Sequence, residues 1–579
     1  MTMLTKWGAV LDRSCPLPEY PRPQLRRESF YNLNGVWDYA VTPSGDEPEV
    51  WDDEIVVPFS PEAPLSGAAR GPAKDEYLHY RRGFTLPEGF QKSRVLLHFG
   101  AVDQIAEVFV NGVSAAKHSG GYWPFSADIT SLLREGENIL RVTVRDNADD
   151  PTFAYGKQRY KRGGMWYTAQ SGIWQTVWLE SVPEVYVKSL RITPEFDEAR
   201  VRIELETALE RSAAITCDVR AADGSFVAGS WAKGGVCVVP LPGFRAWTPD
   251  DPYLYTLDIT CGEDRVESYF AMRKFSYVEL GGHKVFGLNN VPLFHNGLLD
   301  QGYYPDGLLT PPSDEAMVND IETMKRCGFN MLRKHIKIEP LRWYYHCDRL
   351  GMIVWQDMVS GGQPYSFLHV SALPTLGKVD LPDQDAKPYG RSGVLSRARF
   401  RREMADTVRL LYNCPCIALW TVFNEGWGQF DALDMANELK KLDPTRFIDH
   451  ASGWQDQGYE EIKSRHIYFR PVKLKNDGRA LALTEYGGYI LAVDGHRWTD
   501  KVFGYRICRD SAALAHDYEK LMLGQVLPHI RKEGLTAAVY TQITDVEEEL
   551  NGLMTYDREV LKIPEETLRE INAALRFDA

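Results

Sequence analysis

Hydrophobic and polar residues alternate with a period of two in short segments over the first 180 residues of the chain, which is the pattern of half-buried strands. The alternation is clearest in three segments: RVLLHFGAV (94–102), AEVFVNGV (106–113) and NILRVTVRD (138–146). Turn signals such as Asn111-Gly112 separate them. Several short strands at a spacing of about 8–12 residues are typical of a sandwich or jelly roll. We therefore predict a jelly-roll β-sandwich over residues 1–182.

A second region shows the same strand-like alternation and has no helical period. It contains the segments VYVKSLRITPEF, ARVRIELETAL and DPYLYTLDITC. Its length of about 95 residues suits an immunoglobulin-like β-sandwich. We assign residues 183–277 to this second domain.

From about residue 280 onward, short apolar strands alternate with helical stretches. Strands are expected at 330–335, 352–357, 416–425, 466–470, 480–488 and 537–545, and helices at 313–329, 340–351 and 396–413. The helix at 313–329 opens with Ser-Asp-Glu, a helix-start signature. Strands alternating with helices over about 300 residues predict a parallel (β/α)₈ TIM barrel. The expected architecture is therefore multidomain, with two β-sandwiches followed by a catalytic-type barrel over residues 278–579.

Composition and charge narrow the classes of partner. The chain is 44% hydrophobic with a net charge of −14, so a polyanion such as nucleic acid is a poor partner. It contains no apolar run of 18 residues, so no membrane span is expected. The N-terminal segment lacks the apolar core of a signal peptide, and the nine scattered cysteines suit reduced, mostly buried thiols. We expect a cytoplasmic protein.

Two glutamates occupy similar positions at the ends of apolar segments. Glu425 ends CIALWTVFNE, and Glu485 lies near the end of ALALTEYGG. The C-terminal ends of barrel strands face the active site of such folds. Most glutamates are surface charges, but these two follow strands that are too apolar for a wet edge, and glycines follow each of them. The matching positions of the two glutamates at the ends of predicted strands indicate a functional carboxylate pair.

A pair of carboxylates can hydrolyse a glycosidic bond in two ways. At a separation of about 5–5.5 Å one carboxylate attacks the sugar and the configuration is retained, whereas about 6.5–9.5 Å leaves room for water and gives inversion. Sequence spacing does not give this distance, so the residues alone leave both outcomes open.

At these residues the chain resembles glycoside hydrolase family 2, which contains β-galactosidases, β-glucuronidases and β-mannosidases. The resemblance is carried in the N-terminal region by NLNGVWDY (32–39), YRRGFTLP (80–87), VFVNGV (108–113) and SGIWQTVWLE (171–180). In the barrel it is carried by CGFNMLRKH (327–335), CDRLGMIVWQD (347–357), LWTVFNE (419–425) and TEYGG (484–488). The order and spacing of these motifs make the resemblance specific.

The resemblance implies a role for each residue of the pair. Glu425, after the fourth barrel strand, would be the general acid/base, and Glu485, at the end of the seventh strand, would be the nucleophile. Asn424 would donate a hydrogen bond to the 2-hydroxyl of the sugar. The implied mechanism is a two-step, retaining hydrolysis of terminal sugars by an exo-glycosidase. Glu425 must first be protonated, so we expect its pKa to be raised.

Further positions follow from the same resemblance. Tyr468 would donate to the nucleophile or pack in the core, and Arg333 would keep the nucleophile ionised. His335 would contact substrate or have a structural role, and Asp357 would bind a hydroxyl or hold His335. Three aromatic residues are candidates either for stacking on sugar rings or for core packing: Trp427, Tyr486 and Trp498.

Departures from the family pattern bear on the sugar and on the alternatives. The Asn-x-Lys signature of β-glucuronidases is missing, and the C-terminal region reads TDVEEELNGLMTYDRE instead, which disfavours a glucuronidase. No metal ligands can be traced, so no required metal or other cofactor is predicted. A β-galactosidase-type activity on oligosaccharides or other glycosides is the family default, and a furanosidase of the same family is the alternative. A non-catalytic carbohydrate-binding relative is a further alternative, and a homo-oligomer is compatible with the resemblance.

Overall fold

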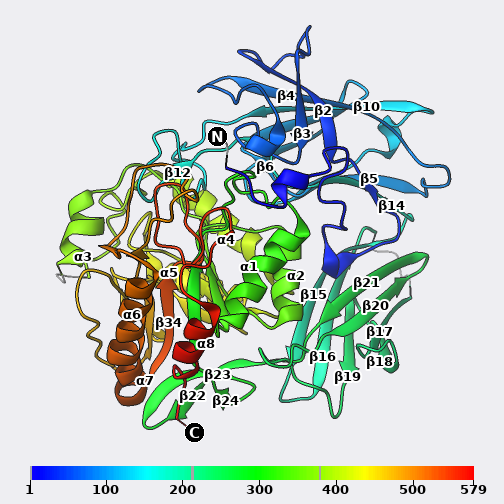
Figure 1. Ribbon diagram of the computed structural model, residues 1–579. Helices are drawn as coiled ribbons and strands as arrows, with labels where there is room; N and C mark the ends of the chain where they lie inside the picture. Colours follow the sequence, from blue (N-terminus) through cyan, green and yellow to red (C-terminus); the bar gives the residue numbers. More distant parts are fainter. Residues whose placement is uncertain (1–2, 210–213, 377–379, 579) are drawn as a thin grey trace.

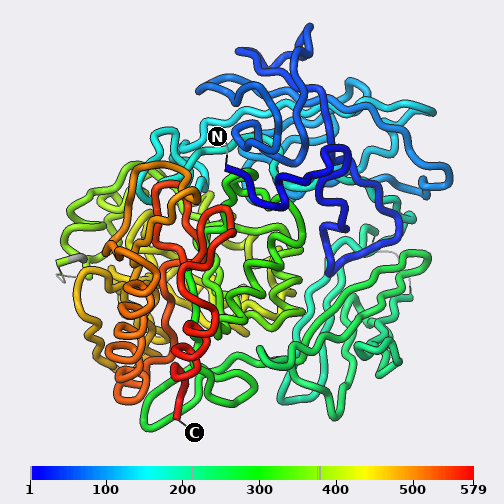
Figure 2. Tube along the Cα trace, in the orientation of Figure 1, coloured from blue at the N-terminus to red at the C-terminus, as the bar shows by residue number. Residues whose placement is uncertain are grey.

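The computed structural model describes residues 3–209, 214–376 and 380–578 of the 579-residue chain. Figure 1 shows a barrel surrounded by helices, with one β-sandwich packed above it and a second packed at its side. The Cα trace in Figure 2 follows the chain from the upper sandwich (blue) through the lateral sandwich (green) into the barrel. This order agrees with the predicted sequence of sandwich, sandwich and barrel.

The N-terminal sandwich consists of a six-stranded and a four-stranded antiparallel sheet. The larger sheet has the order β3 (Asp53–Val57), β2 (Gly35–Thr42), β4 (Tyr77–Thr85), β10 (Glu137–Arg145), β7 (Ile105–Val110) and β8 (Val113–Ser119). The smaller has the order β1 (Tyr31–Asn32), β14 (Val177–Val182), β5 (Arg94–Phe99) and β9 (Phe125–Asp128). Inward-facing residues of both sheets form one apolar core, with Trp37 and Tyr80 almost fully buried.

The middle sandwich packs a three-stranded sheet against a four-stranded one. The first sheet has the order β15 (Val187–Glu195), β16 (Arg200–Thr207) and β19 (Val236–Pro240). The second has the order β18 (Phe226–Trp231), β17 (Ile215–Arg220), β20 (Tyr255–Cys261) and β21 (Asp264–Phe270). In β20, buried and half-buried residues alternate strictly, which is the pattern that the sequence shows in this segment.

Eight parallel strands form the barrel. In chain order they are β25 (His295–Asp300), β26 (Met331–Lys334), β27 (Ile353–Asp357), β28 (Ile417–Thr421), β29 (Phe447–Asp449), β30 (Ile462–Ile467), β31 (Ala480–Gly487) and β34 (Leu535–Thr541). The ladder runs from β29 through β25 and β34 to β30. The strand predicted at 466–470 begins earlier and ends at Ile467, because the buried stretch from Ile462 pairs with β31.

Helices cover the outside of the barrel (Figure 1): α1 (Asp314–Arg326), α2 (Leu341–Leu350), α4 (Val394–Leu411), α5 (Ala432–Leu442), α6 (Ser511–Leu521), α7 (Leu527–Glu533) and α8 (Glu565–Ala573), with a short α3 (Leu373–Thr375). Helix α1 confirms the predicted start, since the Ser313 side chain accepts a hydrogen bond from the Ala316 backbone N–H. Within the described residues, none of the helices is both long and apolar enough to span a membrane.

The two sandwiches contact the barrel in different places. A loop of the N-terminal sandwich reaches the C-terminal ends of the strands, where the Tyr167 hydroxyl donates to Glu549 and the Thr168 backbone N–H donates to Glu547. The middle sandwich instead packs against the barrel side, where the Trp247 indole donates to the backbone carbonyl of Asp348 at 2.8 Å. In the described part of the chain, the N-terminal sandwich thus approaches the end of the barrel that carries the predicted site, whereas the middle sandwich contacts its side.

Candidate active site

Glu425 lies four residues beyond β28 in a sharp turn. Its backbone has a φ of 55°, in the left-handed region that costs a non-glycine residue energy and is enriched at functional sites. Hydrogen bonds hold the turn: the Glu425 backbone N–H donates to Ser452 at 2.9 Å, and the Trp454 indole donates to the Glu425 carbonyl at 2.8 Å. The Glu425 side chain is 21% exposed, so its carboxylate is accessible from the open end of the barrel.

Glu485 lies near the end of β31 and is more deeply buried, with 6% of its side chain exposed. Its Oε1 accepts a hydrogen bond from Arg333 Nη1 at 3.2 Å, and its Oε2 accepts one from the Tyr468 hydroxyl. A charged donor and a phenol hydroxyl on the two oxygens stabilise the ionised carboxylate.

Arg333 connects the predicted site residues to one another. From β26 its guanidinium binds Asp357 through two hydrogen bonds of 3.0 and 3.1 Å, and it donates to the side-chain oxygen of Asn424 at 2.8 Å. Arg333 is fully buried. Although burial alone would raise the pKa of Asp357, the Arg333 charge and the His335 hydrogen bond lower it to about 2. The Arg333–Asp357 pair is therefore charged at neutral pH.

His335 follows β26 and is held by the same carboxylate. Its Nδ1 lies 2.7 Å from Asp357 Oδ2. Burial lowers the pKa of His335 below its usual value, against the opposing effect of Asp357. A neutral imidazole held through Nδ1 keeps Nε2 in a fixed direction.

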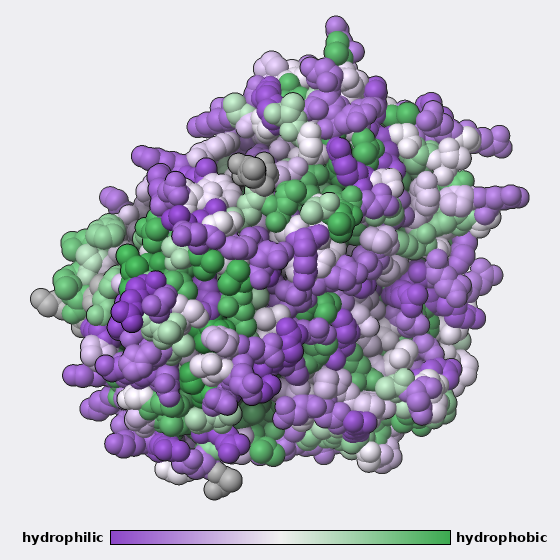
Figure 3. All heavy atoms as spheres, viewed as in Figure 1, coloured by the Kyte–Doolittle hydropathy of each residue, from purple (hydrophilic) through white to green (hydrophobic). Residues whose placement is uncertain are grey.

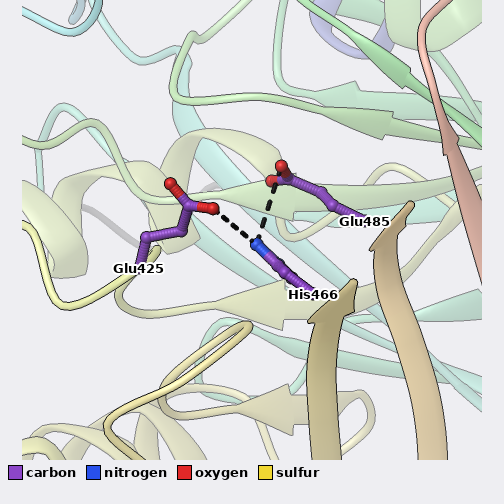
Figure 4. A group of neighbouring side chains, drawn as sticks. All are labelled: Glu425, His466 and Glu485. Atoms are coloured by element: carbon purple, nitrogen blue, oxygen red, sulfur yellow. Dashed lines mark hydrogen bonds and ion pairs between the residues drawn. The ribbon is translucent and has the colours of Figure 1, made fainter. Parts of the chain in front are cut away.

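His466 was not predicted, and it lies between the two glutamates (Figure 4). Its Nδ1 is 2.8 Å from Glu425 Oε1 and 3.6 Å from Glu485 Oε2, and its Nε2 is 3.2 Å from the Ser452 hydroxyl. Burial lowers the pKa of His466 to about 3, so the imidazole is neutral at physiological pH. In the neutral ring, Nδ1 can donate a hydrogen bond to the ionised Glu425 carboxylate or accept one from the protonated carboxyl group, depending on the tautomer. His466 therefore does not fix the charge of Glu425.

The pKa of Glu425 is raised above its usual value, chiefly because burial disfavours the charged carboxylate. Charges nearby act in the opposite direction, and Lys157 is the largest of these. Lys157 comes from the N-terminal sandwich and is buried. The direction of the shift is the one that a general acid needs.

One ligand atom each from Glu425, His466 and Glu485 lies within 4.8 Å of the other two. This spacing is compatible with a metal ion as well as with direct hydrogen bonding. The donors from Arg333 and Tyr468 already supply positive charge and hydrogen bonds to Glu485. The prediction that no metal is required stays a prediction.

The three aromatic candidates lie in different surroundings. Trp427 is buried at the edge of the site and packs edge-on against Trp166 of the N-terminal sandwich, with ring centroids 5.1 Å apart. Trp498 is half-buried beneath the guanidinium of Arg162, 4.2 Å away. Tyr486 is fully buried, and its hydroxyl contacts Met522 in the helical layer. The position of Tyr486 gives no support to its predicted role in sugar binding.

Like His466, four further residues at the site were not predicted from the sequence: Lys157, Trp454, Tyr505 and Glu549. Tyr505 stacks on Tyr468 with ring centroids 3.9 Å apart. Glu549 is buried, accepts from Tyr167, and lies close enough to Glu485 for that charge to raise its pKa, although burial is the larger cause. A usable signal existed only for His466, because it precedes Tyr468 by two residues and alternate residues of a strand share a face.

The order of two sandwiches and a barrel with paired glutamates at its mouth defines a class of multidomain barrel proteins, and three parts of the chain match one family within it. Residues 30–183 match "Glycosyl hydrolases family 2, sugar binding domain", residues 185–273 match "Glycosyl hydrolases family 2", and residues 312–476 match "Glycosyl hydrolases family 2, TIM barrel domain". The chain belongs to glycoside hydrolase family 2.

The relatives that the chain matches are distant in sequence. A β-galactosidase of Halalkalibacterium halodurans is 22% identical over 515 residues, which cover 77% of this chain but only 46% of that protein. A β-glucuronidase of Paenibacillus borealis is 22% identical over 535 residues, 82% of this chain and 85% of that protein. The chain thus spans about half the length of the β-galactosidases that it matches, at 46% and 47% for two of them.

Solved structures agree with the fold along nearly the whole chain. A β-glucuronidase of an uncultured Clostridium sp. gives a TM-score of 0.74 at 19% identity, over 95% of this chain and 98% of that one. A β-galacturonidase of Eisenbergiella tayi bound to galacturonate gives 0.72 at 18% identity, over 96% and 100%. At these identities the likeness shows the fold alone.

Proposed function

We propose that the protein is a retaining exo-glycosidase in which Glu485 is the nucleophile and Glu425 is the general acid/base. The observation that carries the proposal is the difference between the two carboxylates at one site. Glu485 accepts hydrogen bonds from the charged Arg333 and from the Tyr468 hydroxyl, whereas burial raises the pKa of Glu425. Two carboxyl groups in such different environments are suited to separate roles as nucleophile and acid.

The reaction takes place in two steps. Glu485 attacks the anomeric carbon while Glu425 donates its proton to the leaving oxygen, and a covalent glycosyl-enzyme forms. Glu425, now ionised, takes a proton from water, which attacks the same carbon and releases the sugar. Asn424 is positioned by Arg333 at 2.8 Å, so its amide is free to donate to the sugar 2-hydroxyl.

The separation of the carboxylates supports the two-step route. One carboxylate oxygen of Glu425 and one of Glu485 lie within 4.8 Å of each other. This close approach favours the separation of about 5–5.5 Å of retaining enzymes over the 6.5–9.5 Å of inverting ones. An inverting enzyme would need room for a water between them. His466 also lies at this place, with its Nδ1 close to both groups.

For the sugar we propose a neutral glycoside, of the β-galactosidase type by family default. Besides the catalytic pair, Glu549 is a third buried carboxylate near Glu485. A uronate would bring another negative charge into this group, where like charges repel. Lys157 lowers the pKa of both Glu425 and Glu549, so its positive charge balances these protein carboxylates and not the carboxylate of a sugar.

A panel of nitrophenyl glycosides tests the proposal: β-galactopyranoside, β-glucuronide, β-mannoside, β-glucoside, α-L-arabinofuranoside, α-L-arabinopyranoside and β-galactofuranoside. Each is assayed with the wild type and with Glu485→Ala. We expect turnover of a neutral member that disappears in the variant. Turnover of the β-glucuronide alone would contradict the assignment of the sugar, and undiminished turnover by Glu485→Ala would contradict the assignment of the nucleophile.

A further inference from the structure

A cavity of about 650 Å³ opens in front of Glu425, and most of its lining is apolar. The volume is in the range of small-molecule pockets, about 300–1,000 Å³. Glu425, His466 and Tyr468 form its inner end. The outer lining includes Met165 of the N-terminal sandwich together with Phe367, Pro374, Leu376, Phe469 and Phe503.

Several of these apolar side chains are largely exposed to solvent. Phe367 is 71% exposed, and Leu376 and Phe469 are each 69% exposed. On the face drawn in Figure 3, apolar residues gather at the left of the view, over the part of the barrel that carries α3 in Figure 1. Large apolar side chains gathered at one rim are typical of a binding surface rather than of a solvated loop.

Four aromatic rings cluster in one part of the cavity lining: Tyr468, Phe469, Phe503 and Tyr505. Tyr505 stacks on Tyr468 with the ring planes 13° apart, and Phe469 meets Tyr505 edge-on with centroids 5.1 Å apart. Phe503 lies edge-on to the same Tyr505 ring. A planar aromatic ligand gains offset-stacked and edge-to-face contacts from such an arrangement.

Polar side chains are few in the outer cavity. Apart from Glu425, His466 and the tyrosines, two of the described lining residues carry a hydroxyl or a charge: Ser371 and Arg470. A second sugar at this position would need hydrogen-bond partners for several hydroxyls, because polar groups removed from water without partners cost about 1–3 kcal/mol each.

We propose that this cavity binds the leaving group of the substrate and selects an apolar, aromatic aglycone over a second sugar. The proposal rests on the proposed function, because it places the leaving oxygen at Glu425. When the bond between the anomeric carbon and that oxygen breaks, the Glu425 proton passes to the oxygen and the aglycone leaves as a neutral phenol. The bond electrons stay on the leaving oxygen, and Glu485 supplies the pair for the new bond to carbon.

Kinetics on matched substrates test the selection. Once the nitrophenyl panel has fixed the sugar, its 2-naphthyl, phenyl and methyl glycosides and a disaccharide of the same sugar are compared. Phenol and 2-naphthol have similar acidity, so a difference between them reports binding and not leaving-group ability. We expect kcat/KM to be about 10-fold higher for the 2-naphthyl than for the phenyl glycoside, since apolar contacts of this size are worth about 10–200-fold. The disaccharide should be poorer than both.

Variants connect the selection to the cavity. In Phe469→Ser and Phe367→Ser, the loss on the 2-naphthyl glycoside should exceed the loss on the methyl glycoside by about 5–10-fold, because only the former contacts the rim. Phe226→Ser is the matched control, since Phe226 is also largely exposed, at 60%, but belongs to β18 of the middle sandwich. The control should lower neither rate.

Two outcomes would overturn the proposal: equal losses on the naphthyl and methyl glycosides, or a disaccharide that is hydrolysed with a higher kcat/KM than the naphthyl glycoside. Calorimetric titration with free 2-naphthol separates this failure from failure of the glycosidase assignment. Saturable binding that weakens in Phe469→Ser, in a protein that hydrolyses none of the glycosides, would support the cavity and contradict the activity. Turnover without any binding of 2-naphthol would support the activity and contradict the cavity.

Discussion

Glu425 and Glu485 stand at matching places in the barrel, beyond the fourth and near the end of the seventh strand, but their surroundings differ. Glu485 accepts from Arg333 and Tyr468 and has 6% of its side chain exposed. Glu425 is 21% exposed, contacts the neutral His466 and has a raised pKa. Barrel topology thus places the two carboxylates at one site, whereas their different neighbours are what assigns the attack to Glu485 and the proton to Glu425 in the mechanism that we propose.

The largest expected effect comes from removing the proposed nucleophile. Glu485→Ala should lower kcat by at least about 10⁴-fold on every substrate, because no other group can form the covalent intermediate. The rate is measured on the best nitrophenyl glycoside, and sodium azide is added to replace the lost carboxylate. We expect azide to restore turnover with a glycosyl azide of inverted configuration. A variant that keeps near-normal rates without azide would show that Glu485 is not the nucleophile.

Removing the protonated member should give a loss that depends on the leaving group. Glu425→Ala should lower the rate by about 10²–10⁴-fold for an alkyl glycoside, which is the scale of general acid catalysis. A dinitrophenyl glycoside should lose far less in its first step, because its leaving group needs no proton. The measurement is a plot of log kcat/KM against leaving-group pKa for both proteins. Equal losses along the series would take the acid role from Glu425.

A smaller effect is expected from the phenol that donates to Glu485. Tyr468→Phe removes one hydrogen bond to a charged group, worth about 1.5–3 kcal/mol, so kcat should fall by about 10–100-fold. Tyr486→Phe serves as the matched control, since it removes a phenol hydroxyl that contacts Met522 in the helical layer and not Glu485. A Tyr468→Phe enzyme with an unchanged rate would mean that the hydrogen bond from Tyr468 to Glu485 does not contribute to catalysis.

The smallest effect is a shift of the pH profile. Lys157 lowers the pKa of Glu425, so Lys157→Met should raise that pKa further and keep the acid protonated to higher pH. The alkaline limb of kcat/KM on a phenyl glycoside should then move to higher pH, because that limb reports loss of the Glu425 proton. Lys161→Met, in the same loop of the N-terminal sandwich, is the control. A limb that moves to lower pH would contradict the assignment of Glu425 as the acid.

Much of the fold was predictable, because burial leaves a pattern in the sequence. Half-buried strands of the sandwiches show a period of two, and the barrel shows buried apolar strands that alternate with helices. The positions of Glu425 and Glu485 were predictable for the same reason, since Glu425 follows the buried strand β28 and Glu485 lies near the end of the buried strand β31. For Tyr486 the strand pattern favours core packing over stacking on sugar, because it is adjacent to Glu485 on β31 and neighbouring residues of a strand face opposite sides. Its side chain accordingly lies in the helical layer.

The spacing to Tyr468 indicates the face of His466, but its position opposite Glu485 could not be predicted from the sequence, and neither could the position of Lys157. The pairing of β30 with β31 shifts register after Arg465, so that His466 lies opposite Glu485. Irregularities of this kind often occur beside active sites, and the hydrophobic pattern of the strand does not show them. Lys157 belongs to another domain, and its proximity to Glu425 depends on how the N-terminal sandwich packs against the barrel.

The most direct test of the central claim is to trap the glycosyl-enzyme with a 2-deoxy-2-fluoro glycoside of the accepted sugar and to locate the label by peptide mass spectrometry. The fluorine slows both steps by destabilising positive charge at the anomeric carbon, while a good leaving group keeps the first step measurable. We predict one equivalent of sugar bound through an ester to Glu485, in the peptide that contains ALALTEYGG. A label on Glu425, or full inactivation without any covalent sugar, would contradict it.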